Sequence, residues 1–169
     1  DVAGGAPYKF VSGCWAEGLI AARAAMGYVK EGAKTEDADG SEIKRELERV
    51  SAPLRRHEEE GRGVRPREME ERLQKVMDEY AGGVNTFYEI NEERLGVAKR
   101  HIKRMKGQVK FLTAVDYHDL MLAHEVIDRL DLAEVLLEHL SYRKETRWPG
   151  FQTRLDYPHR DDFNWLKFV

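Results

Sequence analysis

Apolar residues recur at helical spacing in three successive segments between residues 66 and 143, and this pattern constrains the fold more than any other feature. Each segment would present one apolar face as a helix, because side chains three, four or seven residues apart share a side. No run of residues alternates convincingly with period two. The pattern therefore predicts a mainly α chain, an antiparallel three- to four-helix bundle without a large sheet. The apolar positions are Met69, Leu73, Val76, Met77 and Tyr80, then Leu95, Ala98, Ile102 and Met105, then Leu120, Ile127, Leu130 and Leu137.

Two further helices are expected ahead of these segments. Ser12 is the predicted N-cap of an alanine-rich helix over residues 14–28, whose small side chains permit close packing against a neighbour. Ser41 is the predicted N-cap of the next helix, which Pro53 should kink or end because proline lacks a backbone N–H. Residues 57–63 are charged and are expected to form a solvated connection.

Terminal residues also place the helices of the bundle. Pro66 suits the first turn of one helix, and Asn91 is the predicted N-cap of the next. The longest helix should run from about Asp116 to about Arg143. After Lys144, prolines, a glycine and many aromatic residues interrupt the helical pattern, so the C-terminal tail is expected to be irregular.

Composition excludes several classes of protein. The 169 residues carry 28 Lys and Arg against 31 Asp and Glu, a balance that argues against a dedicated nucleic-acid binder. Cys14 is the single cysteine, so neither an internal disulfide nor a cysteine metal site can form, and a cytoplasmic location is favoured. The six histidines do not form a ligand set, and no metal site is predicted. No apolar run approaches the roughly 20 residues that span a bilayer, so direct membrane insertion is not expected.

The tail contains a specific series of charged residues. Residues 143–147 read Arg-Lys-Glu-Thr-Arg, and residues 154–165 read Arg-Leu-Asp-Tyr-Pro-His-Arg-Asp-Asp-Phe-Asn-Trp. This series resembles the closing motif of the superfamily of fumarate reductase, succinate dehydrogenase and adenylylsulfate reductase flavoprotein subunits, with Thr146 in place of the usual serine. The insert at residues 148–151, Trp-Pro-Gly-Phe, is more similar to the adenylylsulfate reductase branch.

Two further segments, residues 77–88 and 1–18, also resemble the adenylylsulfate reductase branch. By that resemblance Asp1 contacts the ribityl chain of an FAD cofactor, and the start of the following helix faces the flavin ring. The implied cofactor-binding residues are Asp1, Ser12, Gly13, Cys14 and Trp15. A helix N-terminus suits this place physically, since its unpaired N–H groups and positive dipole end would stabilise the anionic reduced flavin.

Tyr8 and Lys9 are the catalytic candidates, and Lys9 is also the substrate-binding candidate. Lys9 stands where fumarate reductases carry an arginine that grips a substrate carboxylate, and lysine would hold an anion without the bidentate fork. Tyr8 stands where adenylylsulfate reductases carry a histidine, a departure that leaves the substrate open between adenylylsulfate and fumarate or succinate. The alternatives without a catalytic role are a surface position for Lys9 and a packing role for Tyr8.

The charged side chains of the tail are expected to be structural. Glu145, Arg147 and Arg154 should make charge-assisted hydrogen bonds that fasten the tail to the flavin domain. The same role is expected for Asp156, Arg160, Asp161 and Asp162.

The resemblance implies the organisation of the whole chain. Residues 1–31 would end an FAD-binding domain, residues 32–65 form a linker and helix, residues 66–145 form the helical bundle, and residues 146–169 form the tail that packs on the flavin domain. We expect the C-terminal portion of a longer FAD-dependent oxidoreductase subunit that is not catalytic by itself. The complete enzyme would move two electrons between FAD and a small anionic substrate.

Partners follow from the same resemblance. They are the upstream FAD-binding and capping domains of the subunit and an iron–sulfur subunit. An association with a membrane through such partner subunits stays open. The alternative from another class is a free-standing helical module that binds a partner protein, because amphipathic helices support either interpretation.

Overall fold

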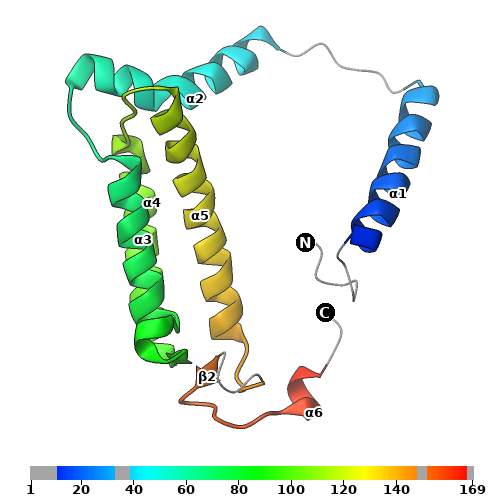
Figure 1. Cartoon of the computed structure of the whole chain (residues 1–169), viewed down its shortest axis with the longest axis vertical. Helices are drawn as coiled ribbons and strands as arrows, with labels where there is room; N and C mark the ends of the chain where they lie inside the picture. The colour runs from blue at the N-terminus through cyan, green and yellow to red at the C-terminus, as the bar shows by residue number, and fades with distance from the viewer. Residues whose placement is uncertain (1–10, 33–38, 148–151, 167–169) are drawn as a thin grey trace. The chain divides into compact units, whose positions relative to one another are not determined.

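The computed structural model describes residues 11–32, 39–147 and 152–166, shown in colour in Figure 1. They divide into two compact units, Asp1–Ile43 and Lys44–Val169. Among the described residues, regular structure is almost entirely helical, and the mainly α fold class is confirmed.

The first unit contains helix α1, Val11–Lys30. The alanine-rich helix is confirmed, but the predicted Ser12 N-cap is wrong, because the helix already begins at Val11 and Ser12 lies in its first turn. From residue 14 onward its side chains are exposed or half-buried, and its apolar residues include Trp15, Ile20 and Val29.

Helix α2, Gly40–Glu60, begins in the first unit and continues into the second. The predicted Ser41 N-cap is wrong, because Asp39 precedes the helix and accepts a hydrogen bond from the Ser41 N–H at 3.0 Å. The helix does not end at Pro53 but runs seven residues further. Residues 57–60, expected in a connection, are therefore helical.

Tertiary hydrogen bonds explain why α2 tolerates the buried Pro53. Proline cannot donate to the carbonyl four residues earlier and disturbs the helical hydrogen bonds around it. The carbonyl of Val50, three residues before it, lies 3.0 Å from Nε2 of His124, which must be the donor because a carbonyl can only accept. The Pro53 carbonyl accepts from the Ala114 N–H at 3.0 Å, and Arg56 donates to the Leu112 carbonyl. The bundle thus supplies partners on both sides of the proline.

Helix α3, Pro66–Tyr80, has proline at its first position as predicted. After the helix, Gly82 adopts φ +81°, a left-handed conformation that suits glycine. The chain then forms a single 3-10 turn η1, Val84–Thr86, and the short strand β1, Glu89–Ile90.

The other two bundle helices begin where they were expected to begin, one of them at its predicted cap Asn91. The Asn91 side chain accepts from the Arg94 N–H at 2.8 Å at the start of α4, Glu92–Gln108. A 3-10 turn η2, Val109–Phe111, leads to α5, Tyr117–Tyr142, where the Asp116 side chain accepts from the Asp119 N–H. The longest helix is thus confirmed with both of its expected ends.

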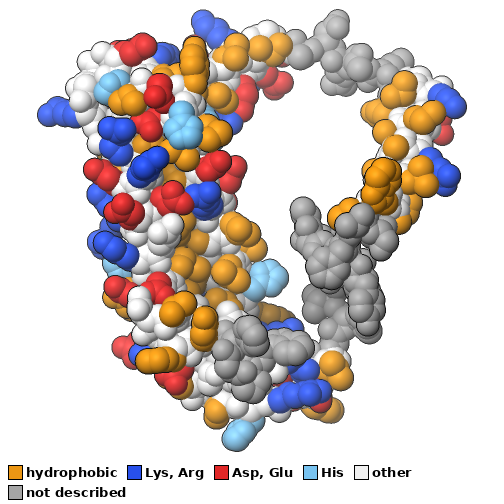
Figure 2. Space-filling model, viewed as in Figure 1, with side chains coloured by type: hydrophobic (Ala, Val, Ile, Leu, Met, Phe, Trp, Pro, Cys, Tyr) orange, Lys and Arg blue, Asp and Glu red, His pale blue; other side chains and the backbone are white. Residues whose placement is uncertain are grey.

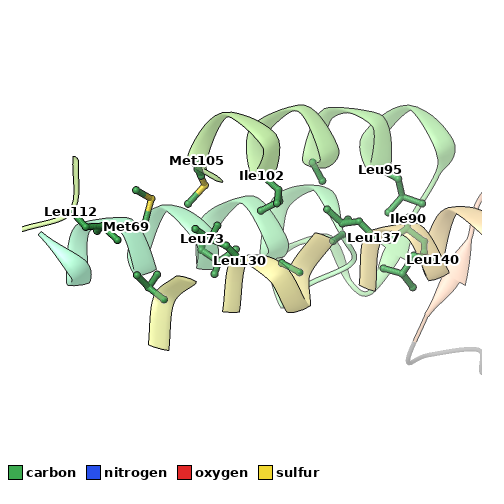
Figure 3. Close-up of a cluster of buried hydrophobic side chains, with 14 of the residues drawn as sticks. Met69, Leu73, Ile90, Leu95, Ile102, Met105, Leu112, Leu130, Leu137 and Leu140 are labelled. Atoms are coloured by element: carbon green, nitrogen blue, oxygen red, sulfur yellow. The ribbon is translucent and has the colours of Figure 1, made fainter. Parts of the chain in front are cut away.

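Helices α3, α4 and α5 pack on one another and enclose the hydrophobic core of the second unit (Figure 3). The core takes the apolar face of each helix and adds Ile90 from β1 and Leu112 from the loop before α5. Full burial of a side chain of this size contributes about 1.5–3 kcal/mol, so the bundle has its own source of stability. The largest apolar side chains with almost no exposed surface are Met69, Ile90, Leu95, Ile102, Leu112, Leu130 and Leu137.

The tail packs on the bundle beside β1 and the C-terminal end of α5. Strand β2, Thr153–Arg154, pairs in parallel with β1, with Glu89 opposite Thr153 and Ile90 opposite Arg154. A four-residue helix α6, Asp162–Trp165, follows. The two-residue strands agree with the expected absence of a large sheet in the described part of the chain. None of the described helices is long and apolar enough to cross a membrane.

Candidate functional site

The predicted cofactor-binding residues lie at the start of α1. Asp1, Tyr8 and Lys9 are outside the described residues, so their roles stay predictions. Ser12 and Gly13 lie in the first turn of α1, and Cys14 and Trp15 follow. The Cys14 side chain is exposed, and 74% of Trp15 is exposed. Within the described residues, no side chain seals the surface of Trp15.

The start of α1 determines which amide groups remain available for a ligand. An α-helix leaves only its first N–H groups without an acceptor inside the helix. Because α1 begins at Val11, the available groups belong to Val11, Ser12 and Gly13, whereas the Trp15 N–H lies inside the helical ladder. The flavin-facing role of the amides at residues 13–15 stays a prediction.

One side of α1 near this start is apolar. Cys14 and Trp15 lie one helical turn before Gly18 and Leu19. The four residues line an open hollow of about 440 Å³. Gly18 has open space where a Cβ would lie. The described lining is therefore an indole ring, a thiol, a leucine side chain and a glycine backbone, a mainly apolar set that an aromatic group can contact.

The charged residues of the tail form a second cluster, at the C-terminal end of α5. No part of the Glu145 side chain is exposed. Its carboxylate accepts hydrogen bonds from Arg143 at 2.7 Å and from Arg147 at 2.7 and 2.9 Å. The Asp161 N–H also donates to it at 2.9 Å. A buried carboxylate with this many donors ties Arg143 and Arg147 to the backbone of Asp161.

Arg154 is the other buried charge of the cluster, with 3% of its side chain exposed. Its guanidinium donates to Asp156 at 2.9 and 3.1 Å and to Glu92 at 3.0 Å. It also donates to the carbonyls of Leu140 and Arg143 at the end of α5. Those carbonyls have no partner inside a helix, so Arg154 acts as a side-chain cap for α5.

Thr146 and Asp161 complete the connection. The buried Thr146 hydroxyl donates to the Tyr157 carbonyl at 2.9 Å and accepts from the Arg154 N–H at 2.9 Å. Asp161 caps α6 by accepting from the Asn164 N–H at 3.0 Å. A serine hydroxyl would satisfy the same two partners as Thr146, which explains why this exchange is compatible with the motif.

The environment shifts the pKa values of the buried Glu145 and the partly exposed Asp156 in the same direction. Burial raises the pKa of Glu145, but hydrogen bonds from Arg147 and the Asp161 N–H outweigh it and hold this pKa below the ordinary value. Burial also raises the pKa of Asp156, but hydrogen bonds from Arg154 and the Glu92 N–H lower it overall. Both groups are therefore carboxylates at neutral pH, and neither is poised as a general acid.

This cluster, Glu92, Arg143, Glu145, Arg147, Arg154 and Asp156, joins the tail to α4 and α5 of the same chain. The described partners of Arg154 and Glu145 lie within the second unit, so these side chains fasten the tail to its own bundle, and the expected packing of the tail on a flavin domain stays a prediction. The structural role itself is confirmed. Sequence reasoning missed Glu92, whose only signal is an acid directly after the Asn91 cap.

The histidines, the cysteine and the acidic residues that the structure describes do not assemble a metal site. No group of three or more His, Cys, Asp or Glu side chains in the described ranges is placed to hold a metal ion. His124 is bound to the Val50 carbonyl, and His101 stacks on Tyr80 with ring centroids 5.8 Å apart. These two histidines have structural roles.

Comparison with known proteins agrees with the tail motif. Residues 70–169 match the family described as fumarate reductase flavoprotein C-term. The chain belongs to this family. The match covers α3 from residue 70 onward, the whole of α4 and α5, and all residues of the tail cluster.

Individual relatives point to one branch of flavoproteins. The alpha subunit of adenylylsulfate reductase from Megalodesulfovibrio gigas is 29% identical over the entire chain. The solved adenylylsulfate reductase of Archaeoglobus fulgidus is 36% identical over 93% of the chain, with a TM-score of 0.86. An adenosine-5-phosphosulfate reductase in complex with sulfite, as a covalent adduct, matches equally well. The Sdh1 complex of Mycobacterium smegmatis, at 22% identity, 80% coverage and a TM-score of 0.65, shares the fold.

The chain is much shorter than these relatives. It spans 27% of the Megalodesulfovibrio subunit and 26% of the Archaeoglobus chain. The matched region is thus about a quarter of a relative.

Proposed function

We propose that the chain is the C-terminal portion of an FAD-dependent oxidoreductase subunit of the adenylylsulfate reductase type. The observation that carries the proposal is the 36% identity to a solved adenylylsulfate reductase over 93% of the chain, at a TM-score of 0.86. The bundle and the tail would form the scaffold of the subunit, and α1 would provide the part nearest to the cofactor.

The described start of α1 fits a flavin. The N–H groups of its first turn have no acceptor inside the helix, and the Trp15 and Cys14 side chains beside them are exposed. Ser12, Gly13 and their neighbours would hold the electron-rich edge of the ring, where the positive end of the helix dipole favours negative charge. FAD would supply two-electron chemistry when bound. Asp1 is proposed to contact its ribityl chain.

The substrate is proposed to be a small anion that reaches the flavin beside Tyr8 and Lys9. Lys9 would hold the anion as a point charge, and Tyr8 would donate a hydrogen bond. Adenylylsulfate is the favoured substrate because a solved adenylylsulfate reductase and a solved adenosine-5-phosphosulfate reductase are each 36% identical over 93% of the chain. Two electrons would pass between the flavin and the substrate and onward to an iron–sulfur partner subunit.

Fumarate or succinate is the second candidate. It is favoured by the family description and by the shared fold of the Sdh1 complex. The structure also weakens one argument against a free-standing helical module, since the tail packs on its own bundle. The exposed apolar side chains of α1 nevertheless favour a larger protein, because an isolated module would leave them in water.

The test is to produce the complete subunit with its iron–sulfur partner and to measure bound FAD by absorbance. Oxidation of reduced methyl viologen is then followed with adenylylsulfate and, separately, with fumarate. Adenylylsulfate-dependent oxidation by an FAD-containing complex would support the proposal, and fumarate-dependent oxidation alone would support the second candidate. A complex that binds no FAD would refute both.

The anion-binding role of Lys9 is tested in the same complex. Lys9→Gln should raise KM for the anionic substrate while the FAD content stays unchanged, because the charge acts on substrate binding. The matched control is Lys30→Gln at the other end of α1. Equal KM values for the two variants would exclude Lys9 from the site.

A further inference from the structure

Helix α4 differs in charge from the two helices on which it packs. On α3 and α5 acidic residues outnumber Lys and Arg, and both signs occur along each helix. Figure 2 shows such a mixed pattern on one face of the bundle, where blue basic and red acidic side chains lie intermixed. Between residues 94 and 110, by contrast, every charged residue is basic. These residues are Arg94, Lys99, Arg100, Lys103, Arg104, Lys106 and Lys110.

Helix α5 neutralises part of this charge. Lys99 pairs with Glu138 at 2.8 Å. Lys106 pairs with Asp131 at 2.7 Å and also with Glu134. The side of α4 that faces α5 therefore has its counter-charges within the bundle, and the contact between the two helices explains these two lysines.

Three basic residues of α4 are left on its outer side. Arg100, Lys103 and Arg104 are exposed, and none of them forms an ion pair with an acid in the described part of the chain. Since each residue turns a helix by about 100°, these side chains lie on the side away from Ile102 and the core. We call them the basic stripe of α4. Like charges four residues apart destabilise a helix, so helix stability does not explain the stripe.

Glycines flank the basic stripe on the same side of the helix. Gly96 lies four residues before Arg100, and Gly107 lies three residues after Arg104. An added Cβ would meet open space at Gly107, and at Gly96 it would lie 3.6 Å from the Arg100 side chain. Glycine weakens a helix relative to alanine, and packing explains neither position. Their missing side chains leave the backbone open to close approach. The acid of α4 on this side is Glu93, in the first turn.

We propose that the basic stripe of α4 is a docking surface for an acidic segment of a transiently bound partner protein. The chemistry of the partner follows from charge complementarity, since exposed unpaired cations attract and orient an anionic surface. All of α4 is described, and none of its large hydrophobic side chains is exposed. A permanently bound subunit buries an apolar centre in its interface. The polar stripe therefore fits a transient contact.

Two other anionic surfaces fit the basic stripe less well. A helix that binds a membrane places Trp, Phe or Leu beside its basic residues, and α4 exposes none of these. Nucleic-acid-binding domains have a broad basic excess, whereas this chain has a net charge of −3 and acids of α5 border α4. A narrow acidic helix or extended segment can contact the stripe without facing those acids.

Binding of an acidic peptide to the complete subunit with its iron–sulfur partner tests the docking. The probe is a fluorescein-labelled oligoglutamate peptide, followed by fluorescence anisotropy at about 50 mM salt, where screening is weak. The stripe variant carries Arg100→Gln, Lys103→Gln and Arg104→Gln. The matched control loses the same charge from exposed positions of α3, through Arg67→Gln, Arg72→Gln and Lys75→Gln.

The stripe variant should bind the peptide about tenfold more weakly than the control, because three exposed ionic contacts are lost. Equal affinities of the two variants would overturn the inference. Duplex DNA or phosphatidylserine vesicles that bind through the stripe when the peptide does not would also overturn it. So would a peptide that binds the subunit alone but not the complex, because a permanent partner would then cover the stripe. Peptide binding needs no flavin, so the FAD content decides the proposed function separately.

Discussion

Arg154 is predicted to be the side chain on which the attachment of the tail depends most. In Arg154→Met the side chain keeps a similar length, but the donors to Asp156, Glu92 and the carbonyls of Leu140 and Arg143 are lost. The changed protein would hold a partly buried carboxylate and two helix-end carbonyls without their donor. Both losses destabilise the folded state.

The magnitude follows from the burial of each partner. Removing one member of a buried ion pair costs about 3–5 kcal/mol. Asp156 keeps the Glu92 N–H at 2.8 Å and 28% of its side chain is exposed, so water can replace part of the loss. The Glu92 carboxylate is 59% exposed and contributes little. We therefore expect the free energy of unfolding to fall by about 3 kcal/mol, the lower end of the range for buried pairs.

Urea unfolding followed by far-UV circular dichroism is the assay. With a slope of about 2 kcal/mol per molar urea, a loss of about 3 kcal/mol lowers the midpoint by about 1.5 M. The control is Arg55→Met, which removes an exposed arginine bonded to the Glu48 carbonyl at 3.3 Å and should shift stability by less than about 0.5 kcal/mol. Arg154→Lys should fall between them, because one ammonium cannot reach four acceptors. Equal midpoints for Arg154→Met and Arg55→Met would refute the stabilising role of the cluster.

Three further predictions concern the second unit. The pKa of Glu145 in the folded state is below the value 4.5 of a free glutamate, so the stability that its carboxylate contributes is present above pH 4.5 and is lost as the pH falls through the lowered pKa. In urea titrations between pH 7 and 3, Glu145→Gln should therefore reduce the loss of stability at acid pH. An unchanged loss would contradict this prediction. Leu137→Ala should cost about 2–5 kcal/mol in the same unfolding assay through a core cavity, whereas a loss below about 1 kcal/mol would place Leu137 outside the core. Gly83→Ala should lower the free energy of unfolding by about 1–3 kcal/mol, because the added Cβ would lie 2.4 Å from Cα of Asp78. Thermal unfolding measures the effect, and the control Gly107→Ala, where the added Cβ meets open space, should not lower stability.

Helices were the part of the fold most accessible from the sequence. The starts at Pro66, Asn91 and Asp116 were predicted because a cap depends on the residue itself and on the amide groups two or three positions away. The core was predicted for the same reason, since Leu73, Ile102 and Leu130 follow the helical period. The predicted caps Ser12 and Ser41 each missed the helix start by about two residues, whereas the larger error at Pro53 lies where another segment decides the outcome.

Helix α2 is one such place. Pro53 alone indicates a helix end, and the sequence near it contains nothing that opposes this. His124 reaches the Val50 carbonyl from 74 residues away, and the Ala114 N–H reaches the Pro53 carbonyl from beyond α4. These partners are available only after the bundle has formed, so local reasoning could not foresee a continuous helix.

The candidate site divides in the same way. The motif residues Glu145 and Arg154 were identified by resemblance, and their structural role was correct. Their partners in the bundle were not foreseen, because the ion pair of Arg154 with Glu92 joins residues 62 positions apart. Cys14 and Trp15 are exposed at the start of α1, whereas Asp1, Tyr8 and Lys9 lie outside the described residues, and the cofactor, catalytic and substrate roles proposed for these residues stay predictions.

The sequence by itself determined the helices, their apolar faces and the family of the chain. Helical hydrogen bonds, caps and amphipathic periodicity act over one or two turns, and a linear pattern records them fully. Only the tertiary structure decided that α2 passes through Pro53, that the tail binds α4 and α5, and that α5 pairs with two lysines of α4 while the basic stripe stays exposed. The physical reason is that these outcomes depend on which distant surfaces meet, and on the donors and apolar groups that each brings to the contact.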